Sequence, residues 1–101
     1  MKNSQLLALV LAFFALQSHG QIVSIPDANF KTFLLNDPNI NTNSDGEIQV
    51  AEAVAYTGVI WCTNHSISSM TGLEAFVNLS ELDCSNNQIV ILDVSANTAL
   101  E

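Results

Sequence analysis

The stretch LSELDCSNNQI at residues 79–89 decides the fold, because apolar and polar residues alternate along it and a polar bend follows. Leu82 and Cys84 take the inward positions of a short strand. The outward positions between and after them hold Glu81, Asp83 and Ser85. The Asn87 side chain can turn inward and hydrogen-bond the backbone of the bend. The pattern therefore predicts a strand near residues 81–85 that ends in a tight turn.

A weaker copy of this pattern lies 22 residues earlier in the chain. The earlier residues Ile60, Cys62, His65, Ile67 and Met70 correspond to Leu82, Cys84, Asn87, Ile89 and Leu92. Thr57 takes the place of Leu79, so the first copy is degenerate, and Leu100 follows Leu79 by 21 residues. One copy cannot bury its apolar side chains alone, whereas neighbouring copies can. The register predicts adjacent parallel strands near residues 59–63 and 81–85.

The form L-x-x-L-x-C-x-x-N-x-I matches the leucine-rich-repeat pattern, with cysteine at the third apolar position. Residues 78–89 and 92–100 resemble the internalin-like, leucine-rich-repeat surface proteins of Bacteroidetes, and so do residues 25–31 (IPDANFK) and 39–43 (NINTN). The resemblance implies an α/β fold: the start of a leucine-rich-repeat solenoid with short parallel strands and a small helical, EF-hand-like N-terminal cap. It also implies a binding or adhesion scaffold. Such proteins often end in a sorting domain for type IX secretion, which is not visible in this sequence.

The first twenty residues have the anatomy of a secretory signal peptide. Lys2 supplies a positive start, an apolar run covers residues 6–16, and the polar tail ends in the small residue Gly20. The run is too short to span a bilayer, so we expect cleavage after Gly20 and a secreted or cell-surface protein, with a retained membrane anchor as the alternative. The predicted parts are a signal peptide over residues 1–20, a helical N-terminal cap over 21–56, and truncated leucine-rich repeats over 57–101.

The chain without the signal peptide is strongly acidic. One lysine, Lys31, stands against ten acidic residues, which gives a formal charge of −9. Such a chain cannot neutralise phosphates, so nucleic-acid binding is not expected, and an anionic membrane surface would repel it. We therefore expect no membrane insertion of the mature chain, and the expected partner is an extracellular protein or a glycan.

Catalytic signatures are missing from the sequence: it has no G-x-S-x-G, no phosphate loop and no dinucleotide fingerprint. The predicted function is an extracellular binding or adhesion scaffold with no catalytic activity in this segment. The alternative is the targeting arm of a longer secreted enzyme whose catalytic domain lies beyond residue 101. No polar C-terminal cap follows the last unit, and about three repeats are usually needed for stability. We therefore interpret the sequence as an N-terminal fragment, with a genuine short protein as the alternative.

Two helices are predicted before the strands. Residues 25–27 (IPD) look like a helix start with Asp27 as N-cap or first-turn acid, and apolar residues then recur with helical spacing until Pro38. A second helix is predicted near residues 49–56.

The segment between these helices, residues 41–52 (NTNSDGEIQVAE), fits a twelve-residue EF-hand calcium loop. The candidate metal ligands are Asn41, Asn43, Asp45, Glu47 through its carbonyl, Gln49 and Glu52. Gly46 takes the place of the sharp turn, and calcium prefers such oxygen donors in flexible geometry. Two features depart from the motif: place one is Asn41 rather than aspartate, and Pro38 breaks the entering helix. The alternative is an Asp-Gly turn that joins two helices and binds no Ca²⁺.

The outward positions of the predicted strands form the candidate ligand-binding face: Trp61, Thr63, Glu81, Asp83 and Ser85, with Val59 beside them. Trp61 is the only tryptophan, and tryptophan is enriched among binding hot spots. Two interpretations stay open. Trp61 contacts a basic protein loop or a sugar ring, or it packs beneath the preceding segment, against Tyr56, and seals the first strand.

Cys62 and Cys84 fall on equivalent inward positions of the two predicted strands, about 4.8 Å apart. Their Cβ atoms would run parallel rather than converge, which disfavours the geometry of a disulfide. We predict two free, buried thiols, with a disulfide as the alternative in an exported protein. His65 replaces the asparagine of the later copy, and a structural role is expected for it rather than catalysis.

Overall fold

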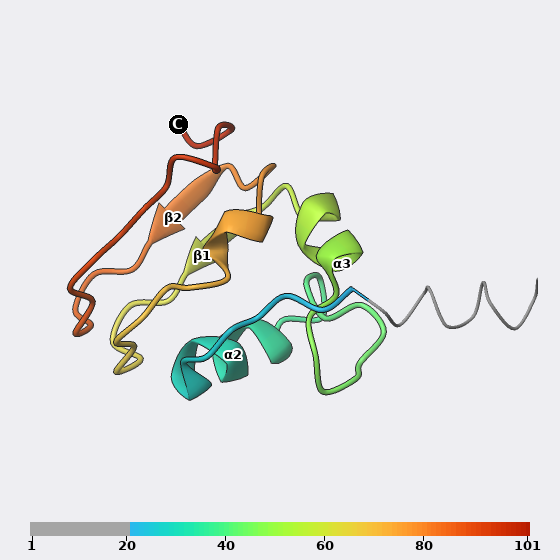
Figure 1. Ribbon diagram of the computed structural model, residues 1–101, viewed down its shortest axis with the longest axis horizontal. Helices are drawn as coiled ribbons and strands as arrows, with labels where there is room; N and C mark the ends of the chain where they lie inside the picture. The colour runs from blue at the N-terminus through green and yellow to red at the C-terminus, as the bar shows by residue number, and fades with distance from the viewer. Residues whose placement is uncertain (1–20) are drawn as a thin grey trace, which may run out of the picture.

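The computed structural model describes residues 21–101, which form short helices and a small sheet joined by long loops (Figure 1). The elements are α2 (Ala28–Leu35), α3 (Val50–Ala55), β1 (Val59–Trp61), the 3-10 helix η1 (Leu73–Ala75) and β2 (Glu81–Asp83). The predicted signal peptide lies outside the described residues. Within residues 21–101, no helix is long and apolar enough to cross a membrane.

Helix α2 begins where the sequence predicts. Asp27 is its N-cap: Oδ1 accepts hydrogen bonds from the backbone N–H groups of Asn29 (3.0 Å) and Phe30 (2.9 Å). The helix ends at Leu35, earlier than the predicted stop at Pro38. A residue that precedes proline avoids the helical region, so the helix closes before the Asp-Pro step.

The second carboxylate oxygen of Asp27 connects α2 to a distant part of the chain. Oδ2 accepts the N–H groups of Ser68 (2.8 Å) and Ser69 (3.2 Å). Burial by itself would raise the pKa of Asp27, but the four N–H donors outweigh it and the pKa is lowered. The sequence showed the helix cap but not this long-range connection.

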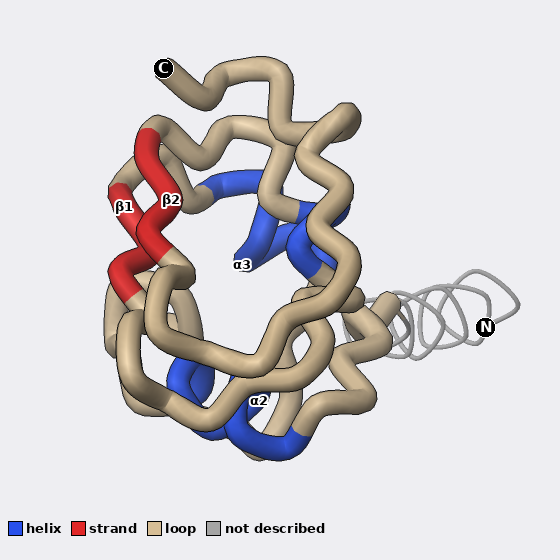
Figure 2. Tube along the Cα trace, turned by 90° about the vertical axis from the view of Figure 1, so that its left-hand side faces the viewer, coloured by secondary structure: helices blue, strands red, loops and turns tan. Residues whose placement is uncertain are grey.

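The two strands lie side by side (Figure 2). They pair in the parallel direction. Val59 pairs with Glu81, Ile60 with Leu82, and Trp61 with Asp83. The 22-residue register and the parallel pairing are therefore confirmed, although each strand is three residues long and shorter than predicted.

The expectation of an α/β fold that begins a leucine-rich-repeat solenoid is wrong. Over residues 21–101 the sheet has two strands, and short helices and loops make up the rest. The sequence pattern describes alternation and a bend within one unit, and these are properties of a few neighbouring residues. A solenoid requires a series of stacked units, which a single pair of strands does not supply.

The core lies between the helical segment and the sheet. Its largest fully buried side chains are Phe30, Leu34, Ile40, Ile48, Ile60, Cys62, Ile67, Leu73, Phe76 and Leu79. Tyr56 follows α3 and packs edge-on against Phe76, with 6.4 Å between ring centroids. Its hydroxyl donates to the Val59 carbonyl oxygen at 2.6 Å, which fixes the start of β1.

Candidate functional site

The outward side chain of β1 is exposed. Trp61 keeps 60% of its surface accessible, while its neighbours Ile60 and Cys62 are fully buried. This is the alternation that the sequence predicts for a strand with one buried face. Tyr56 packs on Phe76 and seals the start of the strand, so the structure does not support the interpretation in which Trp61 is the seal.

The neighbouring strand places charge beside Trp61. Asp83 is the register partner of Trp61, and Glu81, Asp83 and Ser85 are all exposed. Asp83 Oδ1 accepts hydrogen bonds from the Ser85 hydroxyl (2.7 Å) and the Ser85 N–H (3.1 Å). These two bonds lower the pKa of Asp83, with the hydroxyl bond the larger cause. Thr63 is half-buried. The candidate face therefore combines an aromatic plane with carboxylates and a hydroxyl.

The Asn87 side chain holds the bends that follow both strands. Its amide nitrogen donates to the carbonyl oxygens of Cys62 and Cys84, each at 2.9 Å. Its oxygen accepts the N–H groups of His65 (2.9 Å) and Ile67 (3.0 Å). The sequence predicts the bond within the later bend, but the contacts to the earlier bend become visible only in the folded chain.

Both cysteines are free thiols, as predicted, but only Cys62 is fully buried and Cys84 is half-buried. Burial, with a smaller contribution from Cys84, raises the pKa of the Cys62 thiol to about 11. Burial also raises the pKa of Cys84. Since the thiolate is the reactive form, neither side chain is suited to act as a nucleophile near neutral pH.

The candidate calcium loop is held by the buried carboxylate of Glu52. Oε2 accepts the Thr42 hydroxyl (3.1 Å) and the Asn43 N–H (3.2 Å). Oε1 accepts the Gln49 N–H at 3.0 Å, which forms a capping box at the start of α3. The carboxylate at place twelve of the predicted loop therefore binds three protein donors.

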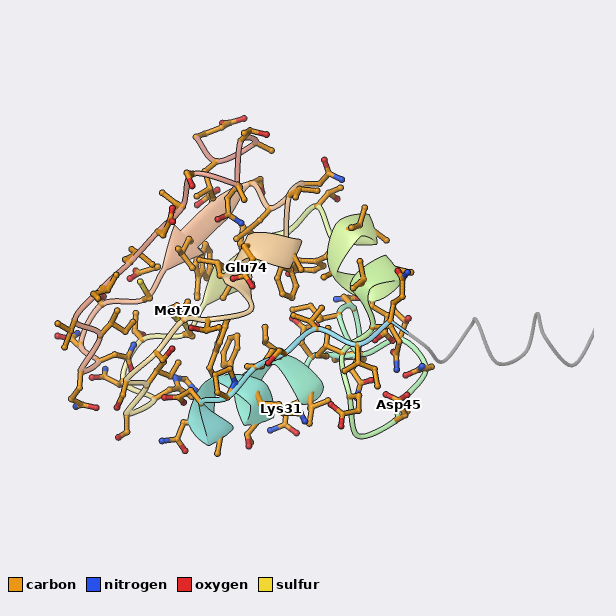
Figure 3. All side chains as sticks on the ribbon, viewed as in Figure 1. Lys31, Asp45, Met70 and Glu74 are labelled. Atoms are coloured by element: carbon orange, nitrogen blue, oxygen red, sulfur yellow. The ribbon has the colours of Figure 1, made fainter. Side chains whose placement is uncertain are left out.

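Asp45 lies on the loop between α2 and α3 (Figure 3) and takes part in a second group of hydrogen bonds. Its Oδ2 accepts the side-chain amides of Gln49 (2.7 Å) and Asn43 (3.1 Å). Its Oδ1 accepts the Glu47 N–H at 3.1 Å. The Glu47 carboxylate in turn pairs with Lys31 of α2, at 2.7 Å between Nζ and Oε1.

These residues carry oxygen atoms of the kind that bind calcium. Most of their side-chain oxygens, however, already accept hydrogen bonds from the protein. One that does not is Asn41 Oδ1, which is buried without a partner while the amide nitrogen donates to Leu35 and Asp45. Across residues 21–101, no group of three or more His, Cys, Asp or Glu residues is arranged to hold a metal. Calcium would have to replace the bonds of Asp45 and Glu52, and its binding stays a prediction.

Replacing Glu52 with glutamine is expected to lower the melting temperature even without calcium, because the new amide nitrogen cannot accept the bonds that the carboxylate holds. The calcium prediction adds that millimolar CaCl₂ raises the melting temperature of the unaltered chain and not of Glu52→Gln. Differential scanning fluorimetry and calorimetric titration measure both effects. Glu47→Gln is the matched control, since the predicted ligand there is the carbonyl. If calcium produces neither binding heat nor a change in the melting temperature of the unaltered chain, the loop is a purely structural turn.

A groove that the sequence did not reveal lies where α2 meets the bend after β1. Its volume is about 450 Å³, and it is lined by Asn29, Thr32, Phe33, Asn36, Asp37, Pro38 and His65. The rings of Phe33 and His65 meet edge-on, with 5.0 Å between centroids. Because the two rings are 32 residues apart in the sequence, only folding brings them together. Phe33 is half-buried: it packs against the core and also lines the groove.

No family model and no curated protein matches this chain. Among solved structures, the chain is similar to one described as the CBM51-2 and INT domains of ZmpB from Clostridium perfringens. The identity is 24% and the TM-score 0.55, over 78% of this chain and 17% of that chain. This chain thus spans less than a fifth of its structural neighbour, and a likeness at this identity shows the fold alone. That structure is not described as a leucine-rich-repeat protein.

Proposed function

We propose that this chain is a non-catalytic extracellular binding module, and that its exposed strand face binds a glycan. The observation that carries the proposal is the exposure of Trp61, 60% accessible on a strand whose other side is buried. Tryptophan is mostly buried in folded proteins, and it is common at binding hot spots. The structural neighbour includes a domain named as a CBM, a carbohydrate-binding module, which supports the choice of ligand.

The chemistry of the face suits a sugar ring. The apolar plane of the indole can cover the C–H side of a pyranose, and the carboxylates of Glu81 and Asp83 can accept its hydroxyl protons. The pKa of Asp83 is lowered by its bonds to Ser85, so this carboxylate is an acceptor at neutral pH. The same face would serve a free-standing module or the targeting arm of a longer secreted enzyme.

Trp61→Ala is expected to weaken binding to the best-bound member of a panel of neutral oligosaccharides by at least tenfold. The melting temperature is expected to stay unchanged, because the side chain covers little of the core. Calorimetric titration measures the oligosaccharide affinity of both proteins. The fluorescence of the single tryptophan also reports binding in the unaltered chain.

Val90→Ala is the matched control, since Val90 is 90% exposed and lies outside the strand face. Phe33→Ala tests the groove beside His65. If Phe33→Ala loses oligosaccharide binding while Trp61→Ala keeps it, the binding site is the groove and not the strand face. Failure of every oligosaccharide to bind the unaltered chain would reject a glycan ligand.

A further inference from the structure

The outer edge of β1, the edge that faces away from β2, leads from Trp61 toward the groove at α2. On the inner side, the N–H groups of Cys62 and Asn64 donate to carbonyl oxygens along β2 and its continuation, at 2.8 and 3.3 Å. Backbone groups of successive strand residues turn to opposite edges. Trp61 and Thr63 therefore turn their backbone groups to the outer edge.

His65 joins this outer edge to the groove. Its Nδ1 lies 2.6 Å from the Thr63 carbonyl oxygen. Since a carbonyl oxygen can only accept, Nδ1 carries the proton, and Nε2 of the neutral ring is then a hydrogen-bond acceptor. The same ring meets Phe33 of α2 edge-on, with 5.0 Å between centroids. The ring thus contacts the strand edge on one side and the groove wall on the other.

The bend around His65 is held by other residues. Asn87, 22 residues later in the chain, turns inward and bonds both bends, whereas the His65 side chain is exposed. The Asn29 amide nitrogen donates to the Ser66 carbonyl oxygen at 2.9 Å. The carboxylate of Asp27 accepts two N–H groups from the residues that follow. The fold therefore leaves the His65 ring at the surface, where it lines the groove.

The lining of the groove suits neutral sugar units. Phe33 supplies an aromatic wall, and Thr32 and Asn36 supply a hydroxyl and an amide, which both donate and accept hydrogen bonds. The described lining contains no lysine or arginine and one carboxylate, that of Asp37. A sugar hydroxyl can donate to this carboxylate, whereas an acidic sugar would be repelled by it.

We propose that the oligosaccharide site on Trp61 continues along the outer edge of β1 into this groove, so that the ligand is a neutral chain of several sugar units. One unit covers Trp61, a later unit packs against Phe33, and His65 Nε2 accepts a hydrogen bond from a sugar hydroxyl. The three extended steps from Trp61 to Asn64 cover about 10 Å, so one pyranose ring cannot contact both aromatic side chains. This inference rests on the proposed function and adds a second contact region to it.

The test varies the length of the sugar chain. The probes are cello-, manno- and chito-oligosaccharides, each from the disaccharide to the hexasaccharide, in calorimetric titrations of the unaltered chain. In the series that binds, the affinity is expected to rise at least tenfold from the disaccharide to the hexasaccharide. The longer chain reaches the second contact region without a second loss of translational freedom.

Two variants locate the cause of this rise. Phe33→Ala is expected to remove the rise, and His65→Ala to reduce it by about threefold or more, while both keep the disaccharide affinity of the unaltered chain. His65 is exposed, so His65→Ala keeps the fold even if Phe33→Ala lowers the melting temperature. Trp61→Ala is expected to weaken binding at every length. Gln88→Ala, an exposed position on the later bend, is the control and should keep the full rise.

The outcomes separate this inference from the proposed function. If Trp61→Ala weakens binding but the affinity does not depend on chain length, the continuation into the groove is overturned and the strand site stands. The same holds if both groove variants keep the full rise. If no series binds the unaltered chain at any length, the proposed function fails and the continuation fails with it.

Discussion

Asn87→Ala is expected to lower the free energy of unfolding by about 3 kcal/mol. The Asn87 side chain accepts the N–H groups of His65 and Ile67 and donates to the carbonyl oxygens of Cys62 and Cys84. Alanine would leave these backbone groups without partners in a partly buried place. The loss of a buried partner costs more than an average hydrogen bond contributes. Urea unfolding followed by circular dichroism measures the change.

Gln88→Ala is the matched control for this substitution. Gln88 is the next residue and is exposed, and its backbone N–H bond to the Ile67 carbonyl oxygen does not need the side chain. We expect its stability to stay within about 0.5 kcal/mol of the unaltered chain. Equal stabilities for Asn87→Ala and Gln88→Ala would show that the bends are held by the backbone alone.

Asp27→Ala is expected to lower the free energy of unfolding by about 2 kcal/mol at neutral pH. Loss of a helix N-cap costs about 1 kcal/mol, and the bonds from Ser68 and Ser69 are lost as well. The side chain is partly exposed, so solvent screening keeps the total below what four buried bonds would contribute. Chemical unfolding at neutral pH measures the difference between the two proteins.

The effect of Asp27 depends on pH in a defined direction. Its pKa is lowered in the folded chain, so the unfolded chain takes up the proton first as the pH falls. The stabilisation is complete above the ordinary aspartate pKa of about 4 and disappears as the pH falls through the lowered value. The stability difference between the unaltered chain and Asp27→Ala should therefore shrink below about pH 4.

Asp93→Ala serves as the comparison. The Asp93 carboxylate is exposed and accepts the N–H of Ser95, two residues along the chain, a bond that connects no distant segments. The melting temperature of Asp93→Ala at neutral pH should match that of the unaltered chain. A loss as large as that of Asp27→Ala would mean that the local carboxylate turn, and not the connection from α2 to Ser68 and Ser69, supplies the stability.

Several local features of this protein follow from the order of its residues. Asp27 as N-cap, the parallel register of Ile60 on Leu82, and the outward position of Trp61 were all predictable. Each depends on a strong short-range rule: a side chain that bonds its own helix start, or a strand that alternates between its two faces. The free thiols of Cys62 and Cys84 follow from the same register.

Other features depend on contacts between distant residues, which no local pattern specifies. The solenoid expectation failed because alternation within units predicts a pair of strands but not a longer series. The bonds from Asp27 to Ser68, the groove between Phe33 and His65, and the protein donors that hold Glu52 arise only when separate segments pack together. Only the tertiary structure decides which hydrogen-bonding groups meet protein partners and which stay open, because that depends on where the whole chain places each neighbouring backbone.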